Sequence, residues 1–507
     1  MKESIQNFSI QWLEKLFILL RQYTVLLQIF TLLFFMAIVF LPLFLPEVPE
    51  NAKPWNNFTV FSNFTIWALW FPLILLSVIL FARSWCGFFC PQGAVSEWAS
   101  YYGLQKRPPA WMRWQGTPIV SFLLITILGQ TLGVRDHPEA IAELFGGTLL
   151  AAMVVGLIYG KYKRVWCRHL CPIGLLLGIF SRLGILYFAC DKKKKLTEEK
   201  QCTEKSCSCG NDELELAEGK ECTGKGECRN KPQLVGEPCT EKGVCPTMID
   251  LRHKKESRHC IACCRCVKLG SSRCVTLGAS RGMAMKTRPP GEEVAMIHRY
   301  SPNIFETFFL FLGTGIALGG FLWIALPFFQ EYRHTFGEWL FSYEWYWAGN
   351  SGPGWLMSVH PQRGESFTWV DFFSITSFML GFMFLLTFVL FAMTALSAWL
   401  AIKLGAKRYF WQSFVELGYQ YAPVAMISLI LGLGVELFYV FTWLGFTHQS
   451  IGTIKFSLFA LAFFWSILLG NQILAWQRVN IKVRWLPLIP CIIGSASIGM
   501  AWNYALF

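Results

Sequence analysis

Nine long apolar runs constrain the fold of this 507-residue chain more than any other feature of its sequence. Runs of about 18 residues or more can cross a bilayer, and backbone groups inside lipid must satisfy their hydrogen bonds within a helix. The predicted helices cover 16–45, 63–82, 117–134, 141–160, 303–328, 369–402, 421–446, 454–476 and 484–506. The sequence therefore predicts an all-α integral membrane bundle of about nine transmembrane helices.

The distribution of basic residues predicts the orientation of this bundle. The net charge is +13, but 27 of the 45 Lys and Arg residues lie between Lys161 and Arg299. Because basic loops stay on the cytoplasmic side, we expect the N-terminus and this region inside a bacterial inner (cytoplasmic) membrane, with Phe507 outside. The charge is thus explained by topology, and no nucleic-acid partner is predicted. The first run is too long for a signal-peptide core, so an anchor is expected.

A duplicated motif follows two of the apolar runs. The chain reads RSWCGFFCPQG over Arg83–Gly93 and RVWCRHLCPIG over Arg164–Gly174. Three interpretations stay open: a metal or redox site, a reversible dithiol switch, or a structural turn in which Pro and Gly mark a helix start. A metal site could take two forms. The two thiolates of one copy, four residues apart, share a helix face and suit copper(I). Alternatively, the four thiolates of both copies converge on one cluster. The metal ligands predicted here are Cys86, Cys90, Cys167 and Cys171.

The segment 190–290 is the one large polar region and holds 13 of the 18 cysteines. It is poor in aromatic residues, so it cannot bury a large apolar core and needs cross-links, such as bound metal or disulfides, to stabilise its fold. In a reducing cytoplasm metal is favoured over disulfides. The expected organisation is a membrane domain over 1–189 with both motif copies, a cytoplasmic ferredoxin-like iron–sulfur domain over 190–290, and a C-terminal membrane domain of five helices over 303–507.

The cysteine spacing in this segment indicates [4Fe–4S] clusters. Cys260, Cys263 and Cys266 form Cys-x2-Cys-x2-Cys, and the Cys-Pro pair at Cys245 supplies a fourth thiolate, as in two-cluster ferredoxins. Cys264 is interpreted as a bystander. A second cluster is predicted on Cys222, Cys228, Cys239 and Cys274. The remaining cysteines either hold a third cluster or replace members of the second set; these are Cys190, Cys202, Cys207 and Cys209.

The paired W-C-x3-C-P-x-G motifs, followed by a two-cluster ferredoxin segment, resemble the NapH/NosR/CcoG group of polyferredoxin membrane proteins. The resemblance covers roughly residues 60 to 280. It implies electron transfer between a membrane quinol pool and redox partners or, in the CcoG branch, copper reduction during oxidase assembly. The chain departs from the group in its expanded first ferredoxin half, in the lack of a NosR-type flavin-binding domain, and in its five C-terminal helices.

The expected function is one-electron transfer between quinone or quinol and a protein redox partner, as one component of an oxidoreductase. Glu436, an acid within an apolar run, is a candidate for proton transfer or a quinone site. Two alternatives stay open: a copper (metal) reductase or assembly factor for a cuproprotein, and a non-catalytic membrane anchor subunit of a larger complex. Two [4Fe–4S] clusters are expected, and a third cluster and bound copper stay open as alternatives. The helices of the protein are expected to contact membrane lipid.

Overall fold

The computed structural model describes residues 2–46, 48–49, 52–160, 163–190, 245–249, 254, 256–267, 283–360 and 365–506. Within these ranges, eight helical segments are long and apolar enough to cross a membrane, so this is a multi-pass membrane protein. The spans are Thr24–Phe44, Phe58–Phe81, Pro138–Ile158, Ile304–Ala325, Trp369–Lys403, Phe410–Leu433, His448–Trp476 and Trp485–Asn503. A ninth apolar helix, Thr117–Thr131, is shorter.

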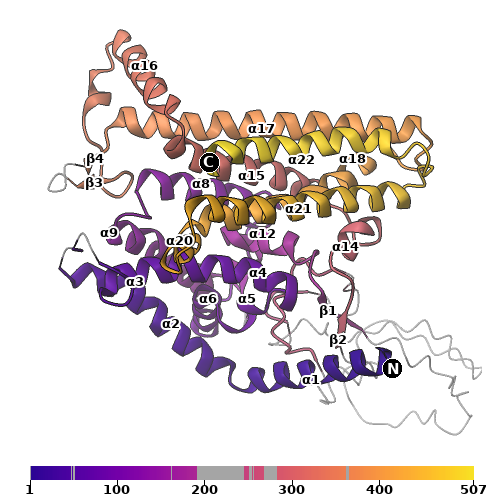
Figure 1. The fold of residues 1–507 in the computed structure, drawn as a ribbon. Helices are drawn as coiled ribbons and strands as arrows, with labels where there is room; N and C mark the ends of the chain where they lie inside the picture. The colour runs from indigo at the N-terminus through magenta and orange to yellow at the C-terminus, as the bar shows by residue number, and fades with distance from the viewer. Residues whose placement is uncertain are drawn as a thin grey trace, which may run out of the picture.

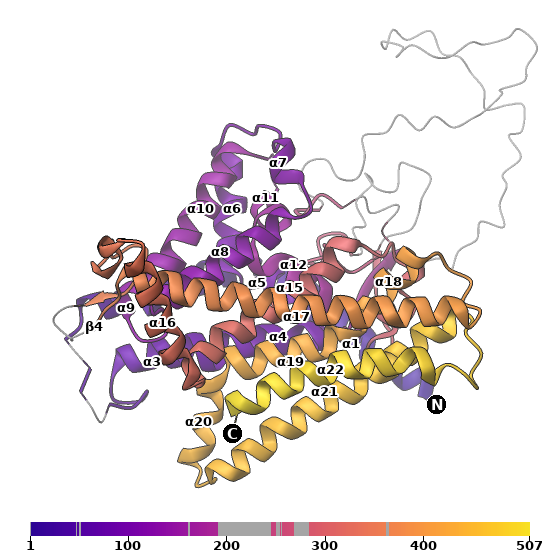
Figure 2. The same ribbon diagram turned by 90° about the horizontal axis from the view of Figure 1, so that it is seen from above.

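The first half of the chain builds two hairpins that each end in a copy of the motif. Its elements are α1 (Lys2–Gln22), α2 (Thr24–Phe40), η1 (Leu41–Phe44), α3 (Phe58–Phe64), η2 (Thr65–Trp70), α4 (Phe71–Phe81), α5 (Ser84–Phe88), α6 (Pro91–Tyr102), α7 (Ala110–Arg113), α8 (Thr117–Thr131), α9 (Pro138–Ile141), η3 (Ala142–Gly146), α10 (Gly147–Ile158), α11 (Val165–His169) and α12 (Pro172–Phe180). Figure 2 shows α6, α10 and α11 to one side of the layer formed by α17, α21 and α22.

The second half adds the long helices of that layer. Its elements are β1 (Leu186–Cys190), β2 (Met283–Thr287), α14 (Glu292–Ala295), η4 (Ile297–Arg299), α15 (Ile304–Ala325), α16 (Phe328–Ser342), η5 (Tyr346–Gly349), β3 (Val359–His360), β4 (Glu365–Ser366), α17 (Trp369–Lys403), α18 (Phe410–Gly418), η7 (Tyr419–Tyr421), α19 (Ala422–Leu433), α20 (Val435–Trp443), α21 (His448–Trp476) and α22 (Trp485–Leu506). The antiparallel pair β1–β2 lies at one end of the bundle and β3–β4 at the other (Figure 1). We call these the cysteine end and the opposite end.

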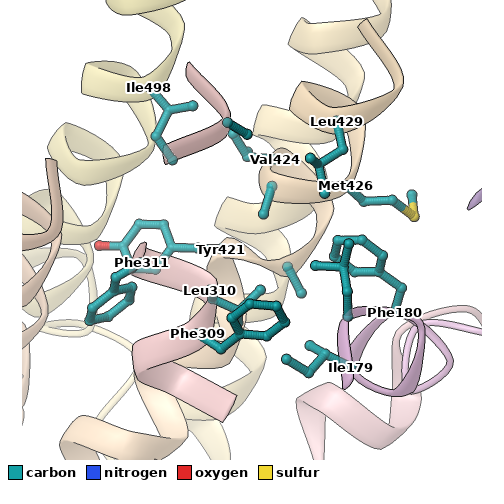
Figure 3. Packing of buried hydrophobic residues seen from close by; sticks show 14 of the residues in the cluster. Ile179, Phe180, Phe309, Leu310, Phe311, Tyr421, Val424, Met426, Leu429 and Ile498 are labelled. Atoms are coloured by element: carbon teal, nitrogen blue, oxygen red, sulfur yellow. The ribbon is translucent and has the colours of Figure 1, made fainter. Parts of the chain in front are cut away.

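The main core joins the two halves. Ile179 and Phe180 of α12 pack with Phe309 and Phe311 of α15, and all four side chains are fully buried (Figure 3). Helices α19 and α22 close the same cluster through side chains that include Leu429. Burying large apolar side chains here stabilises the contact by dense packing, so α12, which carries the second motif copy, is fixed against the C-terminal helices.

Two predicted helix boundaries were wrong. The run 16–45 forms two helices that separate at Tyr23, and the first of them carries polar residues such as Glu14 and Arg21. The run 421–446 is interrupted at Gly434, where a Cβ atom would lie 2.7 Å from Pro72, and the continuous apolar span begins earlier, at Phe410. Residues 410–420 lie outside the predicted helices, yet most of α18 is helical and buried.

Candidate iron–sulfur sites and an adjoining cavity

The structure brings the two motif copies together. The two cysteines of α5 and α11, Cys86 and Cys167, are buried, and Cys90 and Cys171 directly precede α6 and α12. The four sulfurs lie close enough that neighbouring thiols help to raise the pKa of Cys90, Cys167 and Cys171. We call this group the paired-motif site. It lies where the spans Phe58–Phe81 and Pro138–Ile158 both end, as the predicted topology requires.

Each Cys-Pro pair of the motif begins a helix that points its N-terminus at the paired-motif site. Cys90 and Cys171 are the N-cap residues, and Pro91 and Pro172 occupy the first helical position, where a missing N–H costs nothing. The backbone N–H groups of Gln92 and Gly93 partly offset the burial that raises the pKa of Cys90, and that of Ile173 does the same for Cys171. Two helix N-termini therefore favour negative charge on these sulfurs.

The described sulfurs are too far apart for three of them to bind one zinc ion together. A single zinc ion with Zn–S bonds of about 2.3 Å holds its sulfurs no more than about 4.6 Å apart. Among the described side chains, no three cysteine sulfurs all lie within 4.8 Å of one another. Burial raises the pKa of Cys90 to about 11 and that of Cys171 to about 12, each with help from neighbouring thiols. The thiols are thus protonated until a metal group displaces the protons.

Four further cysteines meet beside the first group, and we call them the loop site. Cys260, Cys263 and Cys266 come from the loop 256–267, and Cys245 joins them from an upstream segment. The second motif copy holds that segment in place, because the backbone N–H of Arg164 donates to the Pro246 carbonyl at 2.7 Å. These are the four cysteines that the sequence assigned to one cluster.

The extra cysteine of the loop, Cys264, is buried, whereas Cys260, Cys263 and Cys266 are half-buried. It packs in an apolar cluster with Phe17, Phe88 and Met283, which Cys260 and Cys266 also contact. Its backbone takes a left-handed conformation, as does that of Ala262. Its interpretation as a bystander stays a prediction.

The two sites are in direct contact through Gly87, the residue after Cys86. A Cβ atom at Gly87 would collide with the carbonyl oxygen of Ile261 and would lie 3.1 Å from Cα of Cys263. Gly178 of α12 allows a similar approach, since its Cβ would lie 2.7 Å from the Arg258 carbonyl oxygen. Glycine at both positions therefore lets the loop 256–267 pack directly on the membrane helices.

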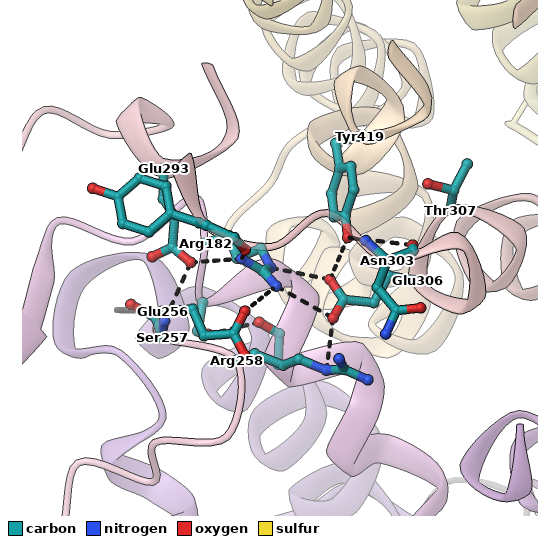
Figure 4. A network of polar contacts seen from close by, with 12 residues as sticks. Arg182, Glu256, Ser257, Arg258, Glu293, Asn303, Glu306, Thr307 and Tyr419 are labelled. Atoms are coloured by element: carbon teal, nitrogen blue, oxygen red, sulfur yellow. Dashed lines mark hydrogen bonds and ion pairs between the residues drawn. The ribbon is translucent and has the colours of Figure 1, made fainter. Parts of the chain in front are cut away.

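A buried ion-pair network fixes the same loop to the C-terminal helices. The Arg182 guanidinium, fully buried, contacts Glu256, Glu293 and Glu306 at 2.8–3.0 Å (Figure 4). Tyr419 of η7 donates to Glu306 at 2.8 Å, and Arg258 pairs with the same carboxylate at 2.6 Å. The loop, the turn after α12, α14, α15 and η7 thus meet at one set of charges. Its members lie far apart in the sequence and were not predicted.

An apolar cavity of about 160 Å³ adjoins the paired-motif site. Gln92, Pro172 and Ile173, which follow the second cysteine of each motif copy, are among its lining residues. The rest of the lining comes from η2, α4, α8, η3, α10, α12, α15 and α19, is mostly apolar, and includes the charged Arg135 after α8. Polar groups are few: Gln92 donates to Thr148 at 2.8 Å, and the buried Nε1 of Trp67 has no hydrogen-bond partner among the described residues.

The other predicted site residues are placed as follows. Glu436 lies in the first turn of α20, outside the cavity lining, beside Arg135, which does line the cavity. Burial raises the pKa of Glu436, against the influence of Arg135. Cys190 is the last residue of β1. The remaining predicted ligands lie outside the described residues: Cys202, Cys207, Cys209, Cys222, Cys228, Cys239 and Cys274.

Comparison with known proteins matches both motif copies to one protein family. The family described as 4Fe-4S binding domain matches residues 63–110 and 144–195, so each match contains one motif copy. A ferredoxin-type methylamine utilization protein, MauN, of Methylorubrum extorquens is 25% identical over 26% of the chain. An uncharacterized protein of Methanocaldococcus jannaschii is 24% identical over 39%.

These alignments span 65% of the Methanocaldococcus protein and 49% of MauN, less than two thirds of either relative. No solved structure matches the chain. The chain thus carries two matches to a 4Fe–4S binding domain, alongside membrane-spanning helices.

Proposed function

We propose that this protein transfers single electrons between a quinone or quinol in the apolar cavity and a protein redox partner, through [4Fe–4S] clusters at the paired-motif site and the loop site. The observation that carries the proposal is the convergence of two Cys-Pro helix N-termini on four cysteines, with the cavity on one side and the loop site on the other.

The residues of both sites fit such clusters. Four cysteines at each site are the usual ligand set, and clusters bound there would supply reversible one-electron transfer. Backbone N–H groups of α6 and α12 stabilise negative charge on the ligand sulfurs, and the buried Arg164 does the same from between the sites, within electrostatic reach of Cys167 and Cys263. The residues therefore raise the reduction potential relative to an unassisted cluster.

The cavity supports a quinone as the small redox partner. Its lining is apolar, as a quinone ring and tail require, and it offers few polar groups to fix the ring carbonyls. The unpartnered Nε1 of Trp67 can donate to such a carbonyl. Gln92, which also lines the cavity, directly follows Pro91 and so connects the cavity wall to the paired-motif site. Oxidation of each quinol releases two electrons, which leave one at a time to the partner protein, and two protons, which leave to water; quinone reduction reverses both flows.

The proposed orientation puts both cysteine sites on the cytoplasmic side of a bacterial inner membrane. The support is the concentration of Lys and Arg between Lys161 and Arg299, which the positive-inside tendency assigns to that side. A partner protein would then approach from the cytoplasm at the cysteine end. Excess positive charge there favours an acidic partner surface.

Iron quantitation with EPR on anaerobically purified protein tests the cluster sites. Two cubes require about eight iron atoms per chain. Cys86→Ser and Cys171→Ser are each expected to lose about four iron atoms per chain, and Cys263→Ser about four others. Cys491→Ser is the matched control, because Cys491 is buried in α22 away from both sites. Unchanged iron in both motif variants would refute the paired-motif site.

Anaerobic titration with a soluble quinol analogue tests the donor. We expect bleaching of the cluster absorbance in the wild-type protein and in Cys491→Ser. A protein with full iron content that neither reduces a quinone nor is reduced by a quinol would exclude the quinone while leaving the cluster assignment intact.

A further inference from the structure

A second group of metal-binding side chains lies at the opposite end of the bundle from the cysteines. His137, Glu139 and His360 each present a ligand atom, and these three atoms all lie within 4.8 Å of one another. Among the described residues it is the one such group of three or more His, Cys, Asp or Glu side chains. We propose that these residues form a divalent transition-metal site of the kind that binds zinc, independent of the iron–sulfur sites.

The turn after α8 positions the first two ligands. Gly133 has φ +65°, and the backbone N–H of His137 donates to its carbonyl at 3.1 Å. A Cβ atom at Gly133 would lie 3.1 Å from Cδ2 of His137, so another residue would be strained and would press on the imidazole. Pro138 then begins α9, which places Glu139 in its first turn. His137 is buried, whereas Glu139 is exposed and open to solvent.

The third ligand comes from the other half of the chain and is held by its own contacts. His360 ends β3, and the segment before it is tied to the end of α8: Ser358 donates its N–H to the Thr131 carbonyl at 2.8 Å, and the Thr131 hydroxyl donates to the Leu356 carbonyl at 2.9 Å. The rings of His137 and His360 lie with their centroids 4.0 Å apart. Figure 1 shows α9 and the β3–β4 pair at the same end of the bundle.

The donor set indicates the class of metal. Two imidazoles and one carboxylate suit zinc and neighbouring first-row ions, whereas magnesium and calcium prefer oxygen ligands alone. Glu143, one turn beyond Glu139, lies near both Glu139 and His360 and adds negative charge. Three protein ligands leave a fourth tetrahedral position for water or a further ligand. A bound ion would also join the hairpin that begins at α9 to the C-terminal membrane helices.

Zinc binding to the intact, iron-loaded protein tests this site. A chelator first removes loosely bound metal, and zinc is then added. We expect the protein to bind about one zinc per chain, with X-ray absorption showing only nitrogen and oxygen neighbours at about 2.0–2.1 Å. Zinc in a cysteine site would instead show sulfur at about 2.3 Å. His137→Ala and His360→Ala should each weaken binding at least about 100-fold, the upper end of what losing an outer-shell partner costs. His334→Ala is the matched control, because His334 lies at the same end in α16 with its side chain 74% exposed.

Iron content separates loss of the zinc ligands from loss of the fold, since it reports the cysteine sites at the other end. If a histidine variant loses iron as well as zinc, Glu139→Gln decides, because an exposed side chain is replaced with little effect on folding. A Glu139→Gln variant that binds zinc like the wild type, or a wild type with no zinc or only sulfur-bound zinc, would overturn the proposal.

Discussion

Arg164 Nε lies 2.7 Å from Oε2 of Glu97, with both side chains almost fully buried. The same Arg164 donates to the carbonyl of Cys86, and Glu97 also pairs with Arg265 of the loop 256–267. Burial alone would raise the pKa of Glu97, but Arg164 and Arg265 outweigh it and bring the pKa to about 2. One carboxylate therefore holds a residue from each cysteine site, and it stays charged throughout the physiological range.

Glu97→Gln is expected to destabilise the junction of the two sites strongly. It leaves the buried guanidinium of Arg164 without its carboxylate, and breaking a buried pair in this way costs about 3–5 kcal/mol. The thermal midpoint and the iron content should both fall. Arg333→Gln is the control, because its pair with Asp371 involves a side chain 44% exposed and is worth about 1 kcal/mol or less. Equal effects of the two substitutions would contradict the role given to Glu97.

Gly87→Ala should separate the two cysteine sites without removing a ligand. Its new Cβ would collide with the Ile261 carbonyl, so the loop must move away from α5. We expect retained iron but weaker magnetic coupling between the reduced clusters in EPR and slower electron transfer to an acceptor. Gly147→Ala in α10 is the matched control and should leave the coupling unchanged. No atom lies within 4 Å of its new Cβ, and Ala favours the helix by up to about 1 kcal/mol. Unchanged coupling in Gly87→Ala would show that the loop packing is irrelevant to transfer.

The local parts of the site could be predicted from the sequence. Pro and Gly after each Cys-x3-Cys indicated a helix start, and α6 and α12 begin at Pro91 and Pro172. The duplication, combined with the charge distribution, placed both copies on one face, which allowed the four cysteines to meet. Spacing likewise grouped Cys245 with the loop cysteines. Each of these inferences depends on short-range spacing or on hydropathy, which one sequence records directly.

The contacts between distant segments could not be predicted. Glu97 and Arg164 are 67 residues apart, and nothing in the pattern of either segment indicates the other. The one available signal was a lone acid in the otherwise apolar and small-residue helix after Cys90. The cavity is also formed by many helices whose apolar residues read only as membrane-spanning. The relation of His360 to His137 depends on how the β3–β4 segment folds back on α8, which hydropathy does not encode.

Lowering the pH should weaken the ion-pair network around Arg182, because it protonates Glu293. Burial alone would raise the pKa of Glu293, but Arg182 and Arg288 outweigh it and lower the pKa from its ordinary 4.5. A lowered folded-state pKa stabilises the protein above pH 4.5, and this contribution is lost as the pH falls through the folded value. Melting between pH 7 and pH 3 should show a steeper acid decline in the wild type than in Glu293→Gln. Glu338→Gln, an exposed carboxylate in α16, should keep the wild-type profile.

Trp67→Phe should weaken quinone use while leaving the clusters intact. The substitution keeps an aromatic ring in the cavity wall but removes the unpartnered Nε1 donor. A neutral hydrogen bond contributes about 0.5–1.5 kcal/mol, so the KM for a quinol analogue should rise about two- to tenfold with unchanged iron content. Trp502→Phe is the matched control, because Trp502 is buried with an unpartnered Nε1 but does not line the cavity. An equal rise in both variants, or in neither, would mean that Trp67 does not bind the quinone ring.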